Sequence, residues 1–286
     1  MLLDTSFKGK HTVVKILNRK HKVHVYIESI INIFMSAVLK KNKYISTPDV
    51  VTLAINKNQK DQLLQVQEKL DAVELGYLTP QQLDGAIINI CKGLTKLQNE
   101  YNFAHRDFHS ANVLFDDKTK QVFIIDFEYS CFSVPDTKGS IQPISKRLFW
   151  HPFAQKAHMA CINNSHDICV LMLSLYHAKP KFRSIKWLDS LCRLITSRYI
   201  AAYNKIKDTK DFKNNYEEQF WNMDGNVFDN DDFSWGKNTG IIHYWYLYTL
   251  FNIDIGVTPF QVRMCVENPT YKIAEVEPSF RLKLKL

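Results

Sequence analysis

Residues 104–129 read AHRDFHSANVLFDDKTKQVFIIDFEY, and this stretch decides the fold that the sequence predicts. Asp107 and Asn112 lie five residues apart in its first half, and the apolar run 122–125 leads directly to Asp126. If the stretch folds as a loop, a hairpin and a turn, these three oxygen-bearing side chains lie close together. Hard cations prefer oxygen ligands, so the stretch predicts a magnesium site.

Each of these side chains also has an ordinary structural explanation. Asp107 could be a turn residue, Asn112 a cap, and Asp126 the end of a strand. As a whole, however, the segment resembles the protein-kinase-like superfamily, whose catalytic loop is H-R-D-x-x-x-x-N and whose metal-binding turn is D-F-G. Here the corresponding residues are HRDFHSAN at 105–112 and DFE at 126–128.

The resemblance implies a role for each residue of the two motifs. His105, Arg106 and Asp107 would form the catalytic part of the loop, where Asp107 orients and deprotonates the acceptor hydroxyl. Asn112 and Asp126 would bind Mg²⁺ together with ATP.

A lysine near the start of the chain fits the same resemblance. Residues 11–17, HTVVKIL, predict the second strand of a hairpin that turns at residues 8–10. Alternation places Val13, Lys15 and Leu17 on one face. By resemblance to the V-A-I-K strand of kinases, Lys15 would hold the non-transferred phosphates of ATP. Without the motif downstream, it would be an edge residue with its ammonium group in water.

Residues 22–41 predict a helix in which Glu28 shares an apolar face with Ile31 and Met35. A carboxylate in that position needs a cation, and the resemblance implies that Glu28 pairs with Lys15 and thereby positions ATP. The alternative is a solvated glutamate on the flank of the helix.

The rest of the chain predicts the remaining elements of a two-lobed fold. Strands are expected at 50–55 and 62–70, and a helix capped by Thr79 leads to the catalytic loop. Asp167 fits both an N-cap and the buried aspartate that supports the catalytic loop in kinases. We therefore predict an α+β, two-lobed, protein-kinase-like fold with a reduced β-rich N-lobe at 1–70 and a mainly α-helical C-lobe at 71–286.

Composition limits the functional classes. The chain has 286 residues, 45% of them hydrophobic, and a net charge of +8, which suits phosphate-bearing ligands. Because the basic residues are scattered, nucleic-acid binding is not expected. No apolar run reaches the roughly 18 residues that a membrane span needs. The six cysteines show neither C-x-x-C nor zinc spacing, so we expect reduced thiols and a cytoplasmic protein, in the host cytoplasm if it is viral.

Three acceptor hypotheses remain open. Arg106 favours ATP-dependent phosphorylation of serine or threonine in a protein, which is the leading prediction. His109 and Glu128 favour a small-molecule alcohol kinase, since the IDFEY run at 125–129 is similar to that of choline and ethanolamine kinases. The lack of a glycine-rich loop before Lys15 favours a pseudokinase that acts as a binding scaffold. A weaker resemblance links the chain to kinase-like proteins of large DNA viruses.

Overall fold

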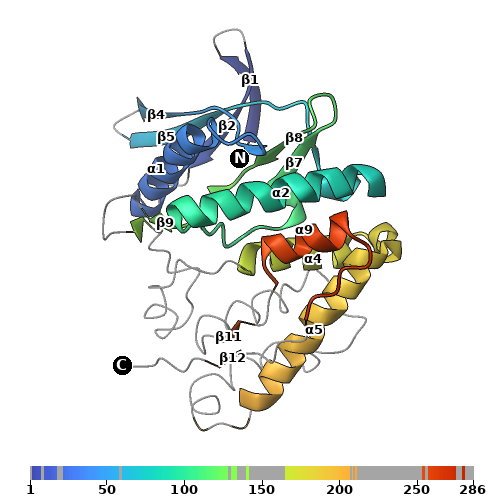
Figure 1. The fold of residues 1–286 in the computed structure, drawn as a ribbon. Coiled ribbons are helices and arrows are strands. Elements are labelled where there is room, and N and C mark those ends of the chain that lie inside the picture. Colours follow the sequence, from blue (N-terminus) through green and yellow to red (C-terminus); the bar gives the residue numbers. More distant parts are fainter. Residues whose placement is uncertain are drawn as a thin grey trace. The chain divides into compact units, whose positions relative to one another are not determined.

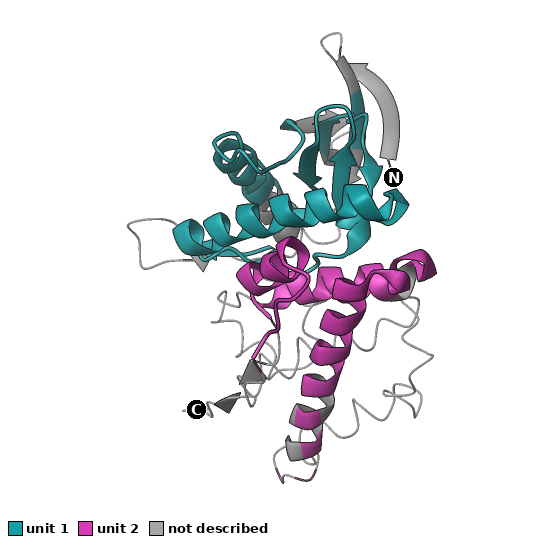
Figure 2. Cartoon of the chain, turned by 45° about the vertical axis from the view of Figure 1, so that its right-hand side comes forward, with its two compact units in different colours: residues 1–148 teal, residues 149–286 magenta. Residues whose placement is uncertain are grey.

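The chain forms two compact units, residues 1–148 and 149–286, which Figure 2 colours separately. The computed structural model describes residues 2–7, 10–17, 22–57, 60–127, 130–133, 140–141, 165–206, 208, 210, 253–254, 257–274 and 279–280. The described part of the first unit combines sheets with helices, and that of the second is mainly helical, which confirms the predicted α+β class. The lobe boundary at residue 70 is not tested by these units and stays a prediction.

The first sheet of unit 1 confirms the predicted N-terminal strands. Its order is β1-β2-β5-β4, and all neighbouring strands are antiparallel (Figure 1). Helix α1 contacts β4, and it buries Ile31, Met35 and Leu39, which are spaced four residues apart. The element bounds are β1 Leu2–Phe7, β2 Lys10–Leu17, α1 Lys22–Leu39, β4 Val50–Lys57 and β5 Lys60–Glu68.

A second four-stranded sheet contains the hairpin that follows the predicted catalytic loop. Its order is β3-β8-β7-β6, with β3 parallel to β8 and the other pairs antiparallel. Helix α2 packs against β3 and β8. The sequence predicted the β7–β8 hairpin but neither β3 nor β6. The bounds are β3 Ile45–Ser46, β6 Val73–Glu74, η2 Leu75–Tyr77, α2 Pro80–Tyr101, η3 Ser110–Asn112, β7 Val113–Asp116, β8 Gln121–Ile124, β9 Phe132–Ser133 and β10 Ser140–Ile141.

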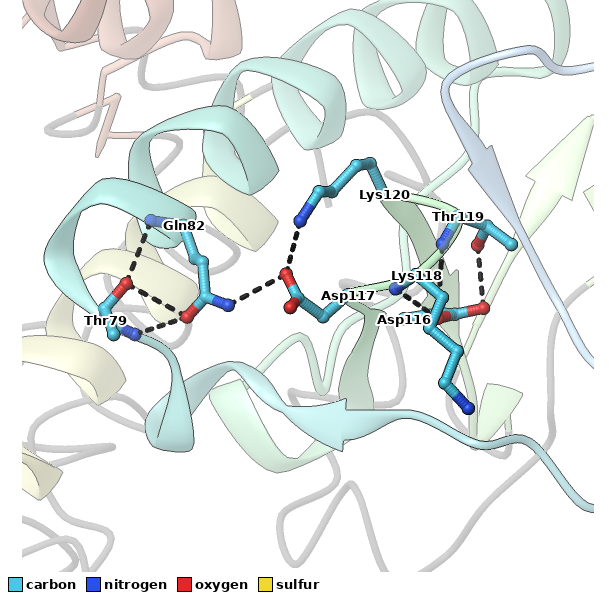
Figure 3. Close-up of polar contacts among 7 residues, drawn as sticks. All are labelled: Thr79, Gln82, Asp116, Asp117, Lys118, Thr119 and Lys120. Carbon is cyan, nitrogen blue, oxygen red and sulfur yellow. Dashed lines mark hydrogen bonds and ion pairs between the residues drawn. The ribbon is translucent and has the colours of Figure 1, made fainter.

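The start of α2 is tied to the turn of this hairpin (Figure 3). Thr79 and Gln82 form the predicted capping box, in which Thr79 Oγ1 accepts from Gln82 N at 3.3 Å and Gln82 Oε1 accepts from Thr79 N at 2.9 Å. Gln82 Nε2 also donates to Asp117 Oδ1 at 2.8 Å, and Lys120 Nζ meets the same oxygen at 2.5 Å. The side chain of Gln82 therefore links the start of the helix to the turn of the hairpin.

The contact between α2 and β3 requires a glycine. A Cβ atom added at Gly93 would lie 2.5 to 2.7 Å from three side-chain carbons of the fully buried Ile45, whereas nothing lies within 4 Å of one at Gly85. We expect Gly93→Ala to lower the free energy of unfolding by about 1–3 kcal/mol through overpacking. Gly85→Ala, in the same helix, should raise it by about 0.5–1 kcal/mol through helix propensity. Urea denaturation of both variants measures these opposite changes in the free energy of unfolding. Equal changes in the two variants would contradict the close approach of Gly93 to Ile45.

The described part of unit 2 is mainly helical, and its first helix carries Asp167 in its first turn, at the helix start that the sequence predicted. Helix α4 packs against α5, and α9 also contacts α5. Helix α9 was not predicted from the sequence. The bounds are α4 His166–Ala178, η6 Pro180–Ser184, α5 Lys186–Ile206, β11 Ile253–Asp254, α9 Pro259–Glu267 and β12 Ser279–Phe280.

One prediction about the cysteines is wrong. Cys131 is disulfide-bonded, whereas Cys91, Cys169, Cys192 and Cys265 are free thiols. The spacing motifs considered in the sequence test only for C-x-x-C pairs and zinc sites, so they do not exclude a disulfide at Cys131. In the part of the chain that the structure describes, no helix has the length and apolar character needed to cross a membrane.

Candidate active site

His105 joins the two motifs of the candidate site. Its side chain is fully buried and lies against the rings of Phe103, Phe108 and Phe127. Its Nε2 lies 3.0 Å from the carbonyl oxygen of Ile125, directly before Asp126, and donates to it because a carbonyl can only accept. The structure therefore gives His105 a supporting position between the catalytic loop and the metal-binding turn.

Backbone hydrogen bonds fix the same junction on both sides. Ala104 and Cys131 exchange hydrogen bonds of 2.9 and 2.8 Å, and Ile125 N donates to the carbonyl oxygen of Asn112 at 3.0 Å. Ser130 Oγ donates to the carbonyl oxygen of His105 at 3.3 Å. The two motifs, separated by the hairpin in sequence, are thus held together as one rigid segment.

Asp107 and Asn112 are in direct contact. Asn112 Nδ2 donates to the backbone oxygen of Asp107 at 2.8 Å and to its Oδ2 at 3.2 Å. These two acceptors fix the orientation of the amide, so Asn112 Oδ1 is directed away from Asp107. That oxygen accepts no hydrogen bond from any described residue, and it suits Mg²⁺ as a ligand.

The carboxylate of Asp126 is the second oxygen donor that the sequence assigned to the metal. No group of three or more His, Cys, Asp or Glu side chains that could bind a metal occurs among the described residues. Magnesium commonly uses one or two protein carboxylates together with substrate phosphates, so Asn112 and Asp126 fit a site that the nucleotide completes.

Two residues of the site have a left-handed backbone. The φ angle is 68° at Arg106 and 62° at Asp126. Aspartate tolerates this region better than arginine does, and glycine adopts it without cost. The backbone at residue 106 therefore suits glycine or asparagine better than arginine.

The backbone at Arg106 gives a stability prediction. Arg106→Gly should be more stable than Arg106→Ala by about 1 kcal/mol, because only alanine keeps the steric cost of the left-handed conformation. Thermal unfolding of the two variants measures this difference. At Gly85, which lies in α2, the same comparison should favour alanine. If alanine were also the better residue at position 106, the left-handed backbone there would be wrong.

Three carboxylates lie near enough to His109 to act on its charge. Burial lowers the pKa of His109, while Asp107, Asp126 and Glu74 act in the opposite direction through their charges. Glu74 is the last residue of β6, which pairs with β7, and no hydrogen bond or ion pair joins its side chain to a described residue. The sequence analysis missed Glu74, because its only local signal was a carboxylate in an irregular connector.

Lys15 and Glu28 lie on the predicted elements, β2 and α1. Their side chains fall outside the described part of the structure, so the predicted ion pair stays a prediction. The register does place Lys15 opposite Gln65 of β5, whose side chain is fully buried.

Comparison with known proteins extends the interpretation of this site. Residues 5–137 match the family model described as choline/ethanolamine kinase. The first half of the chain is similar to these kinases. The matched region includes all seven predicted site residues, and it supports a kinase-type phosphotransferase that uses ATP. No curated protein matches the chain. The resemblance to viral kinase-like proteins is not tested by the family match and stays a prediction.

Proposed function

We propose that this chain transfers the γ-phosphoryl group of ATP to the hydroxyl group of a small cationic amino alcohol. The observation that supports this acceptor is the match to choline/ethanolamine kinase over residues 5–137. The carboxylates of Asp107, Asp126 and Glu74 around the catalytic loop provide the negative potential that would attract a cation. A serine or threonine of a protein, the acceptor favoured by the sequence, has no comparable support.

In the proposed reaction, Asp107 accepts the proton of the acceptor hydroxyl as that oxygen bonds to the γ-phosphorus. The bond between the γ-phosphorus and the bridging oxygen breaks, and ADP leaves. Asn112 and Asp126 would bind Mg²⁺, which when bound neutralises charge on the phosphates. Lys15, paired with Glu28, would hold the non-transferred phosphates. Positioning of the reactants and neutralisation of charge supply most of the catalysis in such transfers.

The test is an amino-alcohol assay. The purified chain is incubated with ATP and Mg²⁺ and with choline or ethanolamine, and the phosphorylated product is measured by mass spectrometry. The proposal expects product that depends on the acceptor and is lost in Asp107→Asn. Transfer to a serine or threonine peptide library without transfer to either amino alcohol would establish a protein kinase instead. Absence of ATP binding in calorimetry would support the scaffold hypothesis.

A further inference from the structure

His109 lies two residues after Asp107 and has no part in the mechanism proposed above. It is the N-cap of η3, where its Nδ1 accepts a hydrogen bond of 3.2 Å from Ala111 N. A nitrogen that accepts from a backbone N–H carries no proton itself, so the proton of the neutral ring lies on Nε2. Burial favours the neutral ring by lowering the pKa of His109.

The protonated side of this ring faces the proposed base. His109 Nε2 lies 3.7 Å from Asp107 Oδ2, and Asn112 Nδ2 donates to the same oxygen at 3.2 Å. No described residue donates a hydrogen bond to the other oxygen, Oδ1, and the Asp107 side chain is 36% exposed. Both nitrogens therefore lie on the side of Oδ2 and leave Oδ1 accessible to the hydroxyl group of the substrate.

We propose that His109 is a positioning residue, which together with Asn112 holds Oδ2 of Asp107 so that Oδ1 is presented to the acceptor hydroxyl. This role rests on the proposed phosphotransferase function. The distance of 3.7 Å is longer than a hydrogen bond, and catalytic hydrogen bonds of this kind often shorten only when the substrates are bound. A small misplacement of a base can lower the rate about 100-fold, so loss of this donor should lower kcat strongly.

A simpler role must be separated from this one, because His109 also caps η3. Asparagine is a favoured N-cap whose short side chain keeps an acceptor for Ala111 N, but it cannot reach Asp107 as imidazole Nε2 does. Glutamine is longer and places an amide donor near the position of Nε2, but it is a weaker cap. His109→Asn therefore keeps the cap and removes the donor, and His109→Gln does the reverse.

The kinetic test uses these two variants of the full chain in the amino-alcohol assay. We expect His109→Asn to lower kcat by about 10- to 100-fold, with KM for ATP and the melting temperature close to those of the wild type. His109→Gln should keep kcat within about fivefold of the wild type while melting at a lower temperature. Wild-type kcat in His109→Asn would overturn the proposal and leave only the cap.

A second measurement does not depend on activity. Spectra of the chain labelled with ¹⁵N only in histidine identify the tautomer of His109, whose signals are assigned by their loss in His109→Asn. The proposal expects a proton on Nε2 whose resonance moves in Asp107→Asn. A proton on Nδ1, or an Nε2 signal that Asp107→Asn does not change, would overturn it. Absence of transfer by the wild type would instead overturn the proposed function, and the spectra would still decide the position of His109.

Discussion

Replacing Asp107 with asparagine is expected to lower kcat about a thousandfold and to leave the affinity for Mg²⁺ and ATP within a few-fold of the wild type. The amide that replaces the carboxylate cannot take a proton from the acceptor hydroxyl, and general-base catalysis contributes about 10² to 10⁴ in rate. Asn112 Nδ2 also donates to the backbone oxygen of residue 107, so the loop should keep its conformation. Steady-state kinetics in the amino-alcohol assay and calorimetry with ATP provide the two measurements.

A matched substitution lies ten residues further along the chain. Asp117 is an exposed aspartate in the β7–β8 turn, where it accepts from Gln82 and Lys120 (Figure 3). Asp117→Asn removes the same charge from the same segment without touching the site, so its kcat should equal that of the wild type. If Asp107→Asn transferred phosphate as fast as Asp117→Asn does, Asp107 would not be the base.

Replacing Asp126 with asparagine should remove most of the magnesium-dependent part of ATP binding. The φ angle of 62° at this position is tolerated by asparagine about as well as by aspartate, so the substitution removes the charge and keeps the backbone. A charged ligand contributes about 1.5–3 kcal/mol, which corresponds to a loss of about 10- to 100-fold in affinity. Calorimetric titration with ATP in the presence of Mg²⁺ measures this loss.

The same titration in the presence of a chelator is the internal control. Without Mg²⁺, the wild type and Asp126→Asn should bind ATP with similar affinity, because the carboxylate acts through the metal. Asp117→Asn should behave as the wild type under both conditions. If Mg²⁺ strengthened ATP binding equally in the wild type and in Asp126→Asn, Asp126 would not be a metal ligand.

Elements with a local sequence pattern could be predicted from the sequence. The hairpin of β1 and β2, helix α1, the pair β4 and β5, and the capped start of α2 all follow from local patterns. The same kind of signal existed for α9, which was missed. Thr258, Pro259 and Gln261 repeat the capping box of α2, and Thr258 Oγ1 accepts from Gln261 N at 3.3 Å.

The chemistry of the catalytic segment was also determined locally. Asn112 lies five positions after Asp107, and the short hairpin that follows returns the chain close to its starting point. The contact between their side chains was therefore predictable, as was the position of Asp126 after a buried strand. The sequence by itself determined that the oxygen-bearing residues of the predicted site lie on one short segment, because a turn and a hairpin within that segment connect them.

Tertiary structure decided the features that depend on distant residues. The parallel pairing of β3 with β8 joins Ile45 to Val122, and the packing of Gly93 against Ile45 joins α2 to that strand. The left-handed backbone of Arg106, the orientation of His109 and the approach of Glu74 depend on the packing around the loop rather than on local propensity. Such contacts leave no repeating pattern in the sequence. Each one depends on how residues far apart in the chain pack together in the complete fold.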